Sequence, residues 1–142
     1  MDFDAIVIGS GQAAVPLAAR LAGRGKKVLL AERSELGGTC VNTGCTPTKT
    51  MIASARAAHV ARTAARLGVH AESVRVDYPA VVARKDAMVA RWRAGVAKRL
   101  ADAGANLRVI MGHARLAGER TVEVAGERHE APVVVLNVGT RP

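Results

Sequence analysis

An apolar run, a helix-like segment and a second apolar run open the chain, and this order restricts the fold more than any other feature. Residues 4–9, DAIVIG, form a β-branched run that ends in glycine and is typical of a buried strand. Residues 12–23 are rich in Ala and Leu and end in glycine, which predicts a helix. Residues 27–32, KVLLAE, predict a second buried strand. Such a strand–helix–strand unit implies parallel strands joined by a crossover.

Two long helices are predicted next, over residues 47–67 and 79–103. In the second helix, apolar residues recur at a spacing of three and four positions: Val81, Val82, Met88, Val89, Trp92, Val96 and Leu100. We expect them to pack as one stripe, with Trp92 inside it and outside any binding site.

Three Val-rich runs, LRVIMG, RTVEVAG and APVVVLNVG, follow and predict strands. The last run is continuously apolar, so we expect it to return to the central sheet, whereas the alternating middle run predicts a half-exposed strand. The sequence therefore predicts an α/β fold with a parallel central sheet and a small antiparallel β-meander near the C-terminus.

Composition excludes several classes of protein. With 142 residues, of which 49% are hydrophobic, the chain is long and apolar enough to form one ordered domain. Its net charge of +9 could attract nucleic acid, but the basic residues are scattered and have no aromatic residues interleaved with them. This pattern favours solvated helix faces over a nucleic-acid site.

No segment reads as a targeting signal or a membrane anchor. The chain opens MDFDAIVIGSG, with acids where a signal peptide carries basic residues, and no run approaches a membrane span. We therefore expect a cytoplasmic protein without a membrane partner. Thiols are normally reduced in that compartment, so a close cysteine pair there favours redox or metal chemistry over a structural disulfide.

The turn between the first strand and the first helix reads Gly9-Ser10-Gly11-Gln12-Ala13-Ala14, a GxGxxA pattern. Gly9 permits the tight turn, Gly11 lets the backbone approach a pyrophosphate, and Ala14 is small enough for close helix packing. Glu32 ends the second strand, where an acid accepts hydrogen bonds from ribose hydroxyls. We expect a dinucleotide site, although a turn used only for packing remains an alternative, and the turn does not separate FAD from NAD.

Both cysteines, Cys40 and Cys45, lie in the stretch GGTCVNTGCTPTK. They could be buried thiols of no special role, half of a metal site, or a redox disulfide. A metal site needs further ligands, and the four histidines show no metal-like spacing: His59, His70, His113 and His129. The redox pair is favoured, because Pro47 predicts a helix start beside Cys45 and a helix N-terminus favours a thiolate.

Three segments together resemble the pyridine nucleotide–disulfide oxidoreductases, the flavoprotein family of dihydrolipoyl dehydrogenase, glutathione reductase and mercuric reductase. They are GSGQAA, AERSELGGTCVNTGCTPTK and VGTRP, in the family's order and approximate spacing along the whole chain. The motif GGTCxNxGCxPxK is long and specific. The variants TGCTPTKT and LNVGTRP are most similar to the mercuric reductase-like and dihydrolipoyl dehydrogenase branch.

The resemblance implies a Rossmann-like domain that binds FAD, with Glu32 at the adenosine ribose and Cys45 against the flavin. Cys40 would then exchange with a small-molecule substrate, and Lys49 would place a positive charge near the flavin ring. Thr39 would be a second flavin neighbour. The positions that the resemblance assigns to cofactor binding are Gly9, Gly11, Ala13, Ala14, Glu32, Gly38, Thr39, Lys49, His113, Ala114 and Gly139.

Two departures limit this interpretation. The family's usual ATG is NVG here, at Asn137 to Gly139, so one threonine hydroxyl is lost. Family members are also about three times longer, so residues 1–142 correspond to a partial N-terminal FAD-binding domain without the NAD(P)H-binding and C-terminal interface domains. A full-length member is expected to use NAD(P)H and to be a homodimer.

Two functional hypotheses follow. The chain is either the N-terminal piece of an enzyme that passes electrons from NAD(P)H through FAD to Cys40 and Cys45, or a truncated, non-catalytic module that binds FAD or holds metal through its two thiols. The final acceptor in the first hypothesis is a disulfide or a metal ion. We expect the 142-residue chain alone to be inactive.

Overall fold

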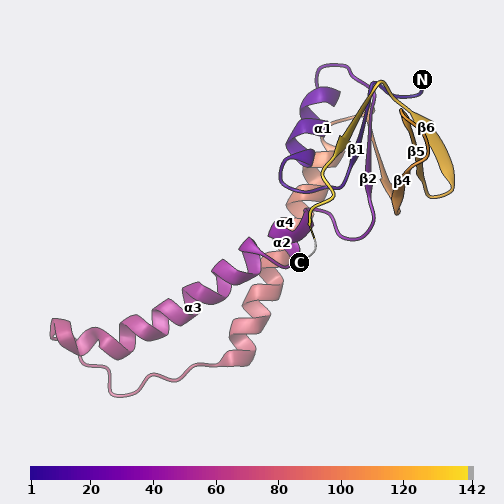
Figure 1. The fold of residues 1–142 in the computed structure, drawn as a ribbon. Coiled ribbons are helices and arrows are strands. Elements are labelled where there is room, and N and C mark those ends of the chain that lie inside the picture. The colour runs from indigo at the N-terminus through magenta and orange to yellow at the C-terminus, as the bar shows by residue number, and fades with distance from the viewer. Residues whose placement is uncertain (141–142) are drawn as a thin grey trace.

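A computed structural model describes residues 1–140 and shows two β-sheets with a long helical arm (Figure 1). The elements run in the order β1 (Ala5–Ile8), α1 (Ala14–Ala22), β2 (Val28–Glu32), α2 (Gly38–Asn42), α3 (Cys45–Thr63), η1 (Ala64–Leu67), α4 (Tyr78–Ala101), β3 (Leu107–Met111), β4 (Ala114–Leu116), β5 (Thr121–Val124), β6 (Glu127–Glu130) and β7 (Val133–Leu136). Arg141 and Pro142, which end the VGTRP segment, lie outside the described residues.

The main sheet is parallel throughout, with the strand order β3-β2-β1-β7. Its central strands, β1 and β2, are apolar and buried, because helices cover one face and the second sheet covers the other. Alternate residues therefore serve different cores: Ile6 packs toward β5, whereas Val7 packs toward α1 and the end of α4. The predicted return of the last run to the central sheet is confirmed, since β7 pairs with β1.

The second sheet contains the antiparallel strands β4, β5 and β6. Val122 and Val124 of β5 are buried against the main sheet, while Thr121 and Glu123 are partly exposed. This alternation confirms both the half-exposed middle strand and the predicted meander. Strand β4 has only three residues and β6 carries no apolar residue, which is why the sequence pattern did not define them individually.

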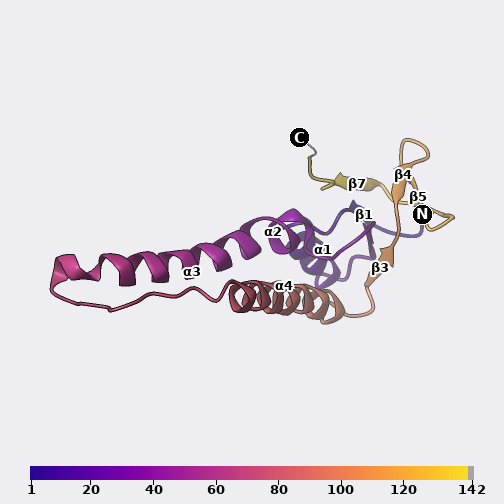
Figure 2. The same cartoon turned by 90° about the horizontal axis from the view of Figure 1, so that it is seen from below.

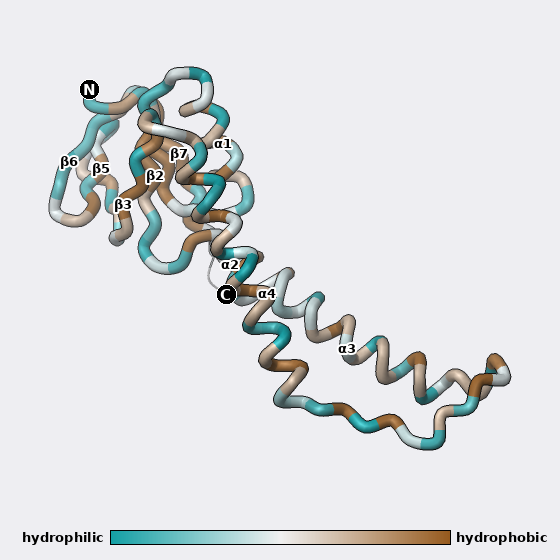
Figure 3. The backbone as a smooth tube through the Cα atoms, turned by 180° about the vertical axis from the view of Figure 1, so that it is seen from behind, coloured by the Kyte–Doolittle hydropathy of each residue, from teal (hydrophilic) through white to brown (hydrophobic). Residues whose placement is uncertain are grey.

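Helices α3 and α4 form an arm that extends from the sheets (Figures 1 and 2). The two helices pack side by side, and Arg84 of α4 donates hydrogen bonds to the Thr50 carbonyl and, over 2.8 Å, to the Ser54 hydroxyl of α3. Apolar residues concentrate in the strands, whereas polar and apolar residues alternate along the arm (Figure 3). The arm therefore contributes little to the core.

Trp92 corrects one prediction, because its exposed fraction is 55% and it does not pack inside an apolar stripe. Only the C-terminal end of α4 reaches the core, where Leu100 is buried beside α1. Trp92 lies about two turns before Leu100, outside the core. The predicted helix bounds also shift slightly, since α3 begins at Cys45 and a short 3-10 turn follows Thr63. Within residues 1–140, no helix has the length and apolar character needed to cross a membrane.

Candidate functional site

The glycine turn joins β1 to α1 at the carboxyl end of the parallel sheet, where open α/β sheets bind their ligands. Gly9 has a φ angle of +96°, and a Cβ atom there would lie 2.3 Å from the Asn137 carbonyl oxygen. Only glycine fits this position. Asn137 follows β7, and its N–H donates to the Ile8 carbonyl over 2.8 Å, so the ends of β1 and β7 are tied together under the turn.

The turn also approaches the segment that carries the cysteines. A Cβ atom on Gly38 would lie 3.0 Å from the Gly11 Cα atom, and Gly38 has a positive φ of 63°. A Cβ atom on Gly11 would meet the Asn137 side-chain nitrogen at 2.6 Å. Three segments that are far apart in the sequence therefore meet closely enough to require small residues.

Ser10 and Glu32 form the polar centre of this junction. The Glu32 Oε2 atom accepts from the Ser10 N–H at 2.9 Å and from the Ser10 hydroxyl at 2.6 Å, while Oε1 accepts from the Ser34 N–H at 3.0 Å. The Ser10 hydroxyl oxygen accepts in turn from the Gly37 N–H at 3.1 Å. Burial alone would raise the pKa of Glu32, but hydrogen bonds from Ser10 and from the backbone of Ser34 outweigh it and lower the pKa below its usual value.

A cavity of about 690 Å³ extends along this junction, within the usual range for ligand pockets. It brings together ten of the predicted site residues: Gly9, Gly11, Ala13, Glu32, Gly38, Thr39, Cys40, His113, Ala114 and Gly139. Three predicted residues do not line it. Ala14 is buried under the turn, while Cys45 and Lys49 are exposed on α3.

The two cysteines lie on consecutive helices. Cys40 is in the five-residue helix α2, and Cys45 is the first residue of α3, after Gly44. Both thiols are free in the structure. A hydrogen bond with Cys45 raises the pKa of the Cys40 thiol, and partial desolvation adds to this rise. The positive charge of Lys49 acts in the opposite direction and lowers the pKa of Cys40.

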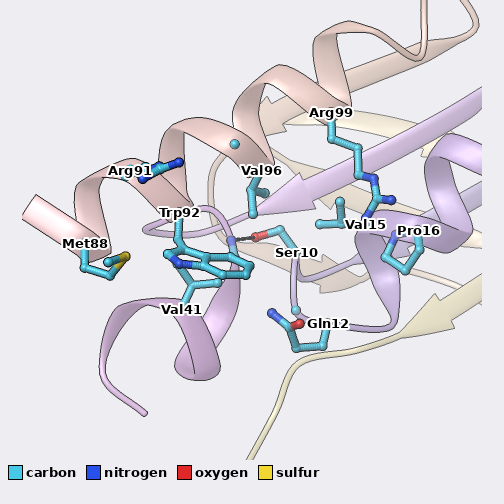
Figure 4. Close-up of a pocket in the computed structure, with 13 residues that line it drawn as sticks. Ser10, Gln12, Val15, Pro16, Val41, Met88, Arg91, Trp92, Val96 and Arg99 are labelled. Carbon is cyan, nitrogen blue, oxygen red and sulfur yellow. Dashed lines mark hydrogen bonds between the residues drawn. The ribbon is translucent and has the colours of Figure 1, made fainter. Parts of the chain in front are cut away.

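A second cavity, of about 580 Å³, lies on the other side of the glycine turn, between α1, α2 and α4 (Figure 4). Trp92 projects into it from α4, and Met88, Arg91 and Arg99 line it from the same helix. Gly95 also lines this cavity, and a Cβ atom there would meet no atom within 4 Å. The cavity combines an aromatic surface with two guanidinium groups.

Sequence reasoning missed several residues that line the first cavity or hold it together. They are Ser10, Gln12, Arg33, Ser34, Glu35, Asn42, Thr43, Gly112, Asn137 and Val138. Ser10 occupies an unspecified position of the GxGxxA pattern, and Asn137 stands where the family's ATG has Ala, so neither motif indicates the contacts that these side chains make with distant segments. Among residues 1–140, no group of three or more His, Cys, Asp or Glu side chains is placed to hold a metal ion.

Comparison with known proteins agrees with this geometry. The family model of the pyridine nucleotide-disulphide oxidoreductases matches residues 3–142. A glutathione reductase of Burkholderia cepacia is 37% identical over 141 residues, which cover 99% of this chain and 31% of that protein. A mercuric reductase of Streptomyces lividans is 38% identical over 126 residues, which cover 87% of this chain and 26% of the relative.

A solved structure shares the fold. It is the Cu(II) complex of RclA from Escherichia coli, described as an HOCl-induced flavoprotein disulfide reductase. The two align with a TM-score of 0.80 and 29% identity, over 98% of this chain and 29% of RclA. The chain thus spans less than a third of the length of these relatives.

Proposed function

The chain belongs to the pyridine nucleotide-disulphide oxidoreductase family, and we propose that it is the N-terminal, partial FAD-binding domain of an enzyme that passes electrons from NAD(P)H through FAD to Cys40 and Cys45. The observation that carries this proposal is that the glycine turn, Glu32 and Cys40 all line the same cavity, the first one. The NAD(P)H-binding and interface domains of such an enzyme would lie outside these residues.

The residues of the first cavity fit a flavin dinucleotide. Gly9 and Gly11 keep the turn free of side chains, and the adjacent N-terminus of α1 offers backbone N–H groups and a partial positive charge to phosphates. His113 and Ala114 line one part of the cavity, and Thr39 and Cys40 line another. When bound, FAD would carry two electrons between a nicotinamide and the cysteine pair.

Glu32 would have two tasks in this proposal. Its carboxylate already accepts hydrogen bonds from Ser10 and Ser34, but an ionised carboxylate has about four lone-pair sites, so it can also accept from a ribose hydroxyl. The exposed fraction of Glu32 is only 7%, so it meets a ligand over a small part of its surface. A change at Glu32 would therefore affect the turn as well as the cofactor.

The cysteines would perform a thiol–disulfide exchange. The Cys40 sulfur, after losing its proton, attacks one sulfur of the substrate disulfide and releases the other as a thiol. Cys45 then displaces the second substrate thiol and forms the Cys40–Cys45 disulfide. The protein dithiol is oxidised by two electrons, and one substrate disulfide is reduced to two thiols.

The second cavity is suited to the part of a substrate that does not react. Gly37, which precedes the helix of Cys40, and Val41, which directly follows Cys40, both line this cavity, so the cavity lies next to the helix that carries the thiol. Arg91 and Arg99 favour an anionic substrate, and Trp92 offers a flat apolar surface. A metal ion is the other substrate class, because the relatives include mercuric reductases and the matched RclA structure is a Cu(II) complex.

A spectroscopic and thiol-counting experiment tests the proposal. The purified chain is mixed with FAD, and retained flavin and free thiols are measured before and after mild oxidation by glutathione disulfide. We expect weak but measurable flavin binding, and two thiols that disappear on oxidation and return on reduction. A chain that binds no flavin but takes up metal in a fixed ratio to its two thiols would instead support a dithiol metal-binding module.

A further inference from the structure

Helix α2, which carries Cys40, is too short to hold its own conformation. It has five residues, it follows Gly37 with a φ angle of +100°, and no side chain caps its N-terminus. Isolated helices of this length are not stable in water, because the conformational entropy lost in forming the first turn exceeds the stabilisation from so few hydrogen bonds. The orientation of Cys40 therefore depends on contacts that reach α2 from other segments.

Asn42, the last residue of α2, makes several of these contacts. Its side-chain nitrogen donates to the carbonyl oxygens of Leu36 and Gly38, both at 3.0 Å, and approaches that of Glu35 at 3.4 Å. These bonds fold the preceding loop back onto the helix. One amide group therefore binds both the loop, at Glu35 and Leu36, and the first residue of the helix, Gly38.

Arg93 of α4 holds Asn42 and the loop at the same time. Its Nε atom donates to the Asn42 Oδ1 atom at 3.0 Å, and its Nη1 atom lies 3.1 Å from the Glu35 Oε2 atom. Arg93 is half-buried, with a side-chain exposed fraction of 38%. The planar guanidinium thus connects the helix that carries Cys40, and the loop before it, to the long helix α4.

We propose that Arg93 is a positioning residue for the cysteine pair: through Asn42 and Glu35 it holds α2 so that the Cys40 sulfur faces Cys45. This inference rests on the proposed redox function. Arg93 acts through geometry and not through its charge. The charged neighbours that shift the pKa of Cys40 are Cys45 and Lys49, and neither is bonded to Arg93, Asn42 or Glu35 in the contacts described above.

The expected consequence is a larger effective concentration of one thiol beside the other. Oxidation joins Cys40 to Cys45, reduces one glutathione disulfide to two glutathione molecules and transfers two electrons. A pair that is already in place loses less conformational entropy when the bond forms. Without Arg93, α2 samples more orientations, and the protein disulfide becomes less stable.

The test equilibrates the whole chain with defined ratios of glutathione to glutathione disulfide. The samples are trapped by alkylation, and the oxidised fraction is read by mass. The variants are Arg93→Met, which keeps the apolar stem, and Arg93→Lys, which keeps the charge without the planar fork. Lys98→Met is the control, because it removes one positive charge and an exposed ion pair with Asp102 from the same helix.

For Arg93→Met we expect the equilibrium constant for disulfide formation to fall about three- to tenfold, the effect of losing part of a charge-assisted hydrogen bond. The equilibrium constant of Arg93→Lys should lie between those of Arg93→Met and the unmodified chain. Thermal unfolding followed by the fluorescence of Trp92, the only tryptophan, separates this effect from a loss of fold. A variant that melts earlier but keeps the normal equilibrium constant would overturn the inference.

Two further outcomes would also contradict it: Lys98→Met changing the equilibrium as much as Arg93→Met, or Arg93→Lys behaving as the unmodified chain. An unmodified chain that never forms the disulfide would instead overturn the proposed function on which the inference rests.

Discussion

The side chains of Ser10 and Glu32 connect the first turn, the second strand and the cysteine segment by accepting hydrogen bonds from backbone N–H groups and by bonding to each other. The Glu32 carboxylate accepts a hydrogen bond from the Ser10 hydroxyl. The oxygen of that hydroxyl accepts in turn from the Gly37 N–H, just before α2. A ligand in the first cavity would therefore contact a surface whose shape depends on one buried carboxylate. The charge of Glu32 contributes to stability before any ligand binds.

We predict that Glu32→Gln lowers the free energy of unfolding near neutral pH, and that the difference shrinks in acid. Hydrogen bonds lower the pKa of Glu32 in the folded chain, so its contribution is present above the unfolded pKa of about 4.3 and is lost as pH falls through the folded value. Denaturant unfolding at several pH values between about 3 and 7 measures it. A difference that stays constant over this range would show that the charge of Glu32 does not matter.

A second prediction concerns the proton on Cys40. Because a hydrogen bond with Cys45 raises the pKa of Cys40, Cys45→Ala should move the pH profile of Cys40 alkylation by iodoacetamide to lower pH. Lys49→Met should move the profile to higher pH, because the lysine charge lowers the same pKa. The measurement is the rate of modification against pH, read by mass. Shifts of the same sign in both variants would contradict these causes.

The sequence predicted the residues that obey a local rule and missed those that act across the fold. Gly9 and Glu32 follow from the order of strand, turn, helix and strand, and the structure brings both into one cavity. Arg93 belongs to no local pattern, and the cysteine motif contains Asn42 without indicating its partner, because their contact joins residues 51 positions apart in the chain. Only the packing of α4 against α2 makes them neighbours.

At the scale of elements, α4 shows how periodicity overstates burial. Its apolar residues recur at helical spacing, yet only Leu100 is buried, because only the last turns of the helix pack against α1 and the main sheet. A stripe predicts which residues share a face, but it does not tell how much of that face is covered. In contrast, the continuous apolar runs of β1 and β2 predicted full burial correctly, since both faces of those strands are covered.

The uncovered part of α4 leads to a prediction about the second cavity. Gly95→Leu should fill the open space beside Trp92 and slow the reaction of reduced Cys40 with glutathione disulfide several-fold, while iodoacetamide, a much smaller reagent, reacts as before. Ala94→Leu is the control, because Ala94 is exposed on the same helix and does not line the cavity. Equal effects of the two substitutions, or none from Gly95→Leu, would count against a substrate in this cavity.

At the scale of the whole molecule, the main sheet has an open edge at β7. Within residues 1–140 this strand pairs with β1 on one side and has no partner strand on the other, and Val133 and Leu136 are exposed. Leu136 directly precedes Asn137, Val138 and Gly139, which line the first cavity. The same exposed edge therefore borders the proposed cofactor site and offers a strand that another chain could pair with.

We therefore predict that residues 1–142 alone bind FAD weakly, associate through β7 and do not oxidise NAD(P)H. The described segments surround the first cavity only in part, so a bound flavin would stay exposed to water, and each large apolar side chain left uncovered forgoes about 1.5–3 kcal/mol of burial. Leu136→Lys should reduce self-association, because a charge on an edge strand opposes pairing, whereas Val60→Lys on the arm should not. Light scattering, retained flavin and NAD(P)H absorbance with a disulfide acceptor measure the three properties. A monodisperse chain with one tightly held flavin and steady turnover would show instead that this unit is complete by itself.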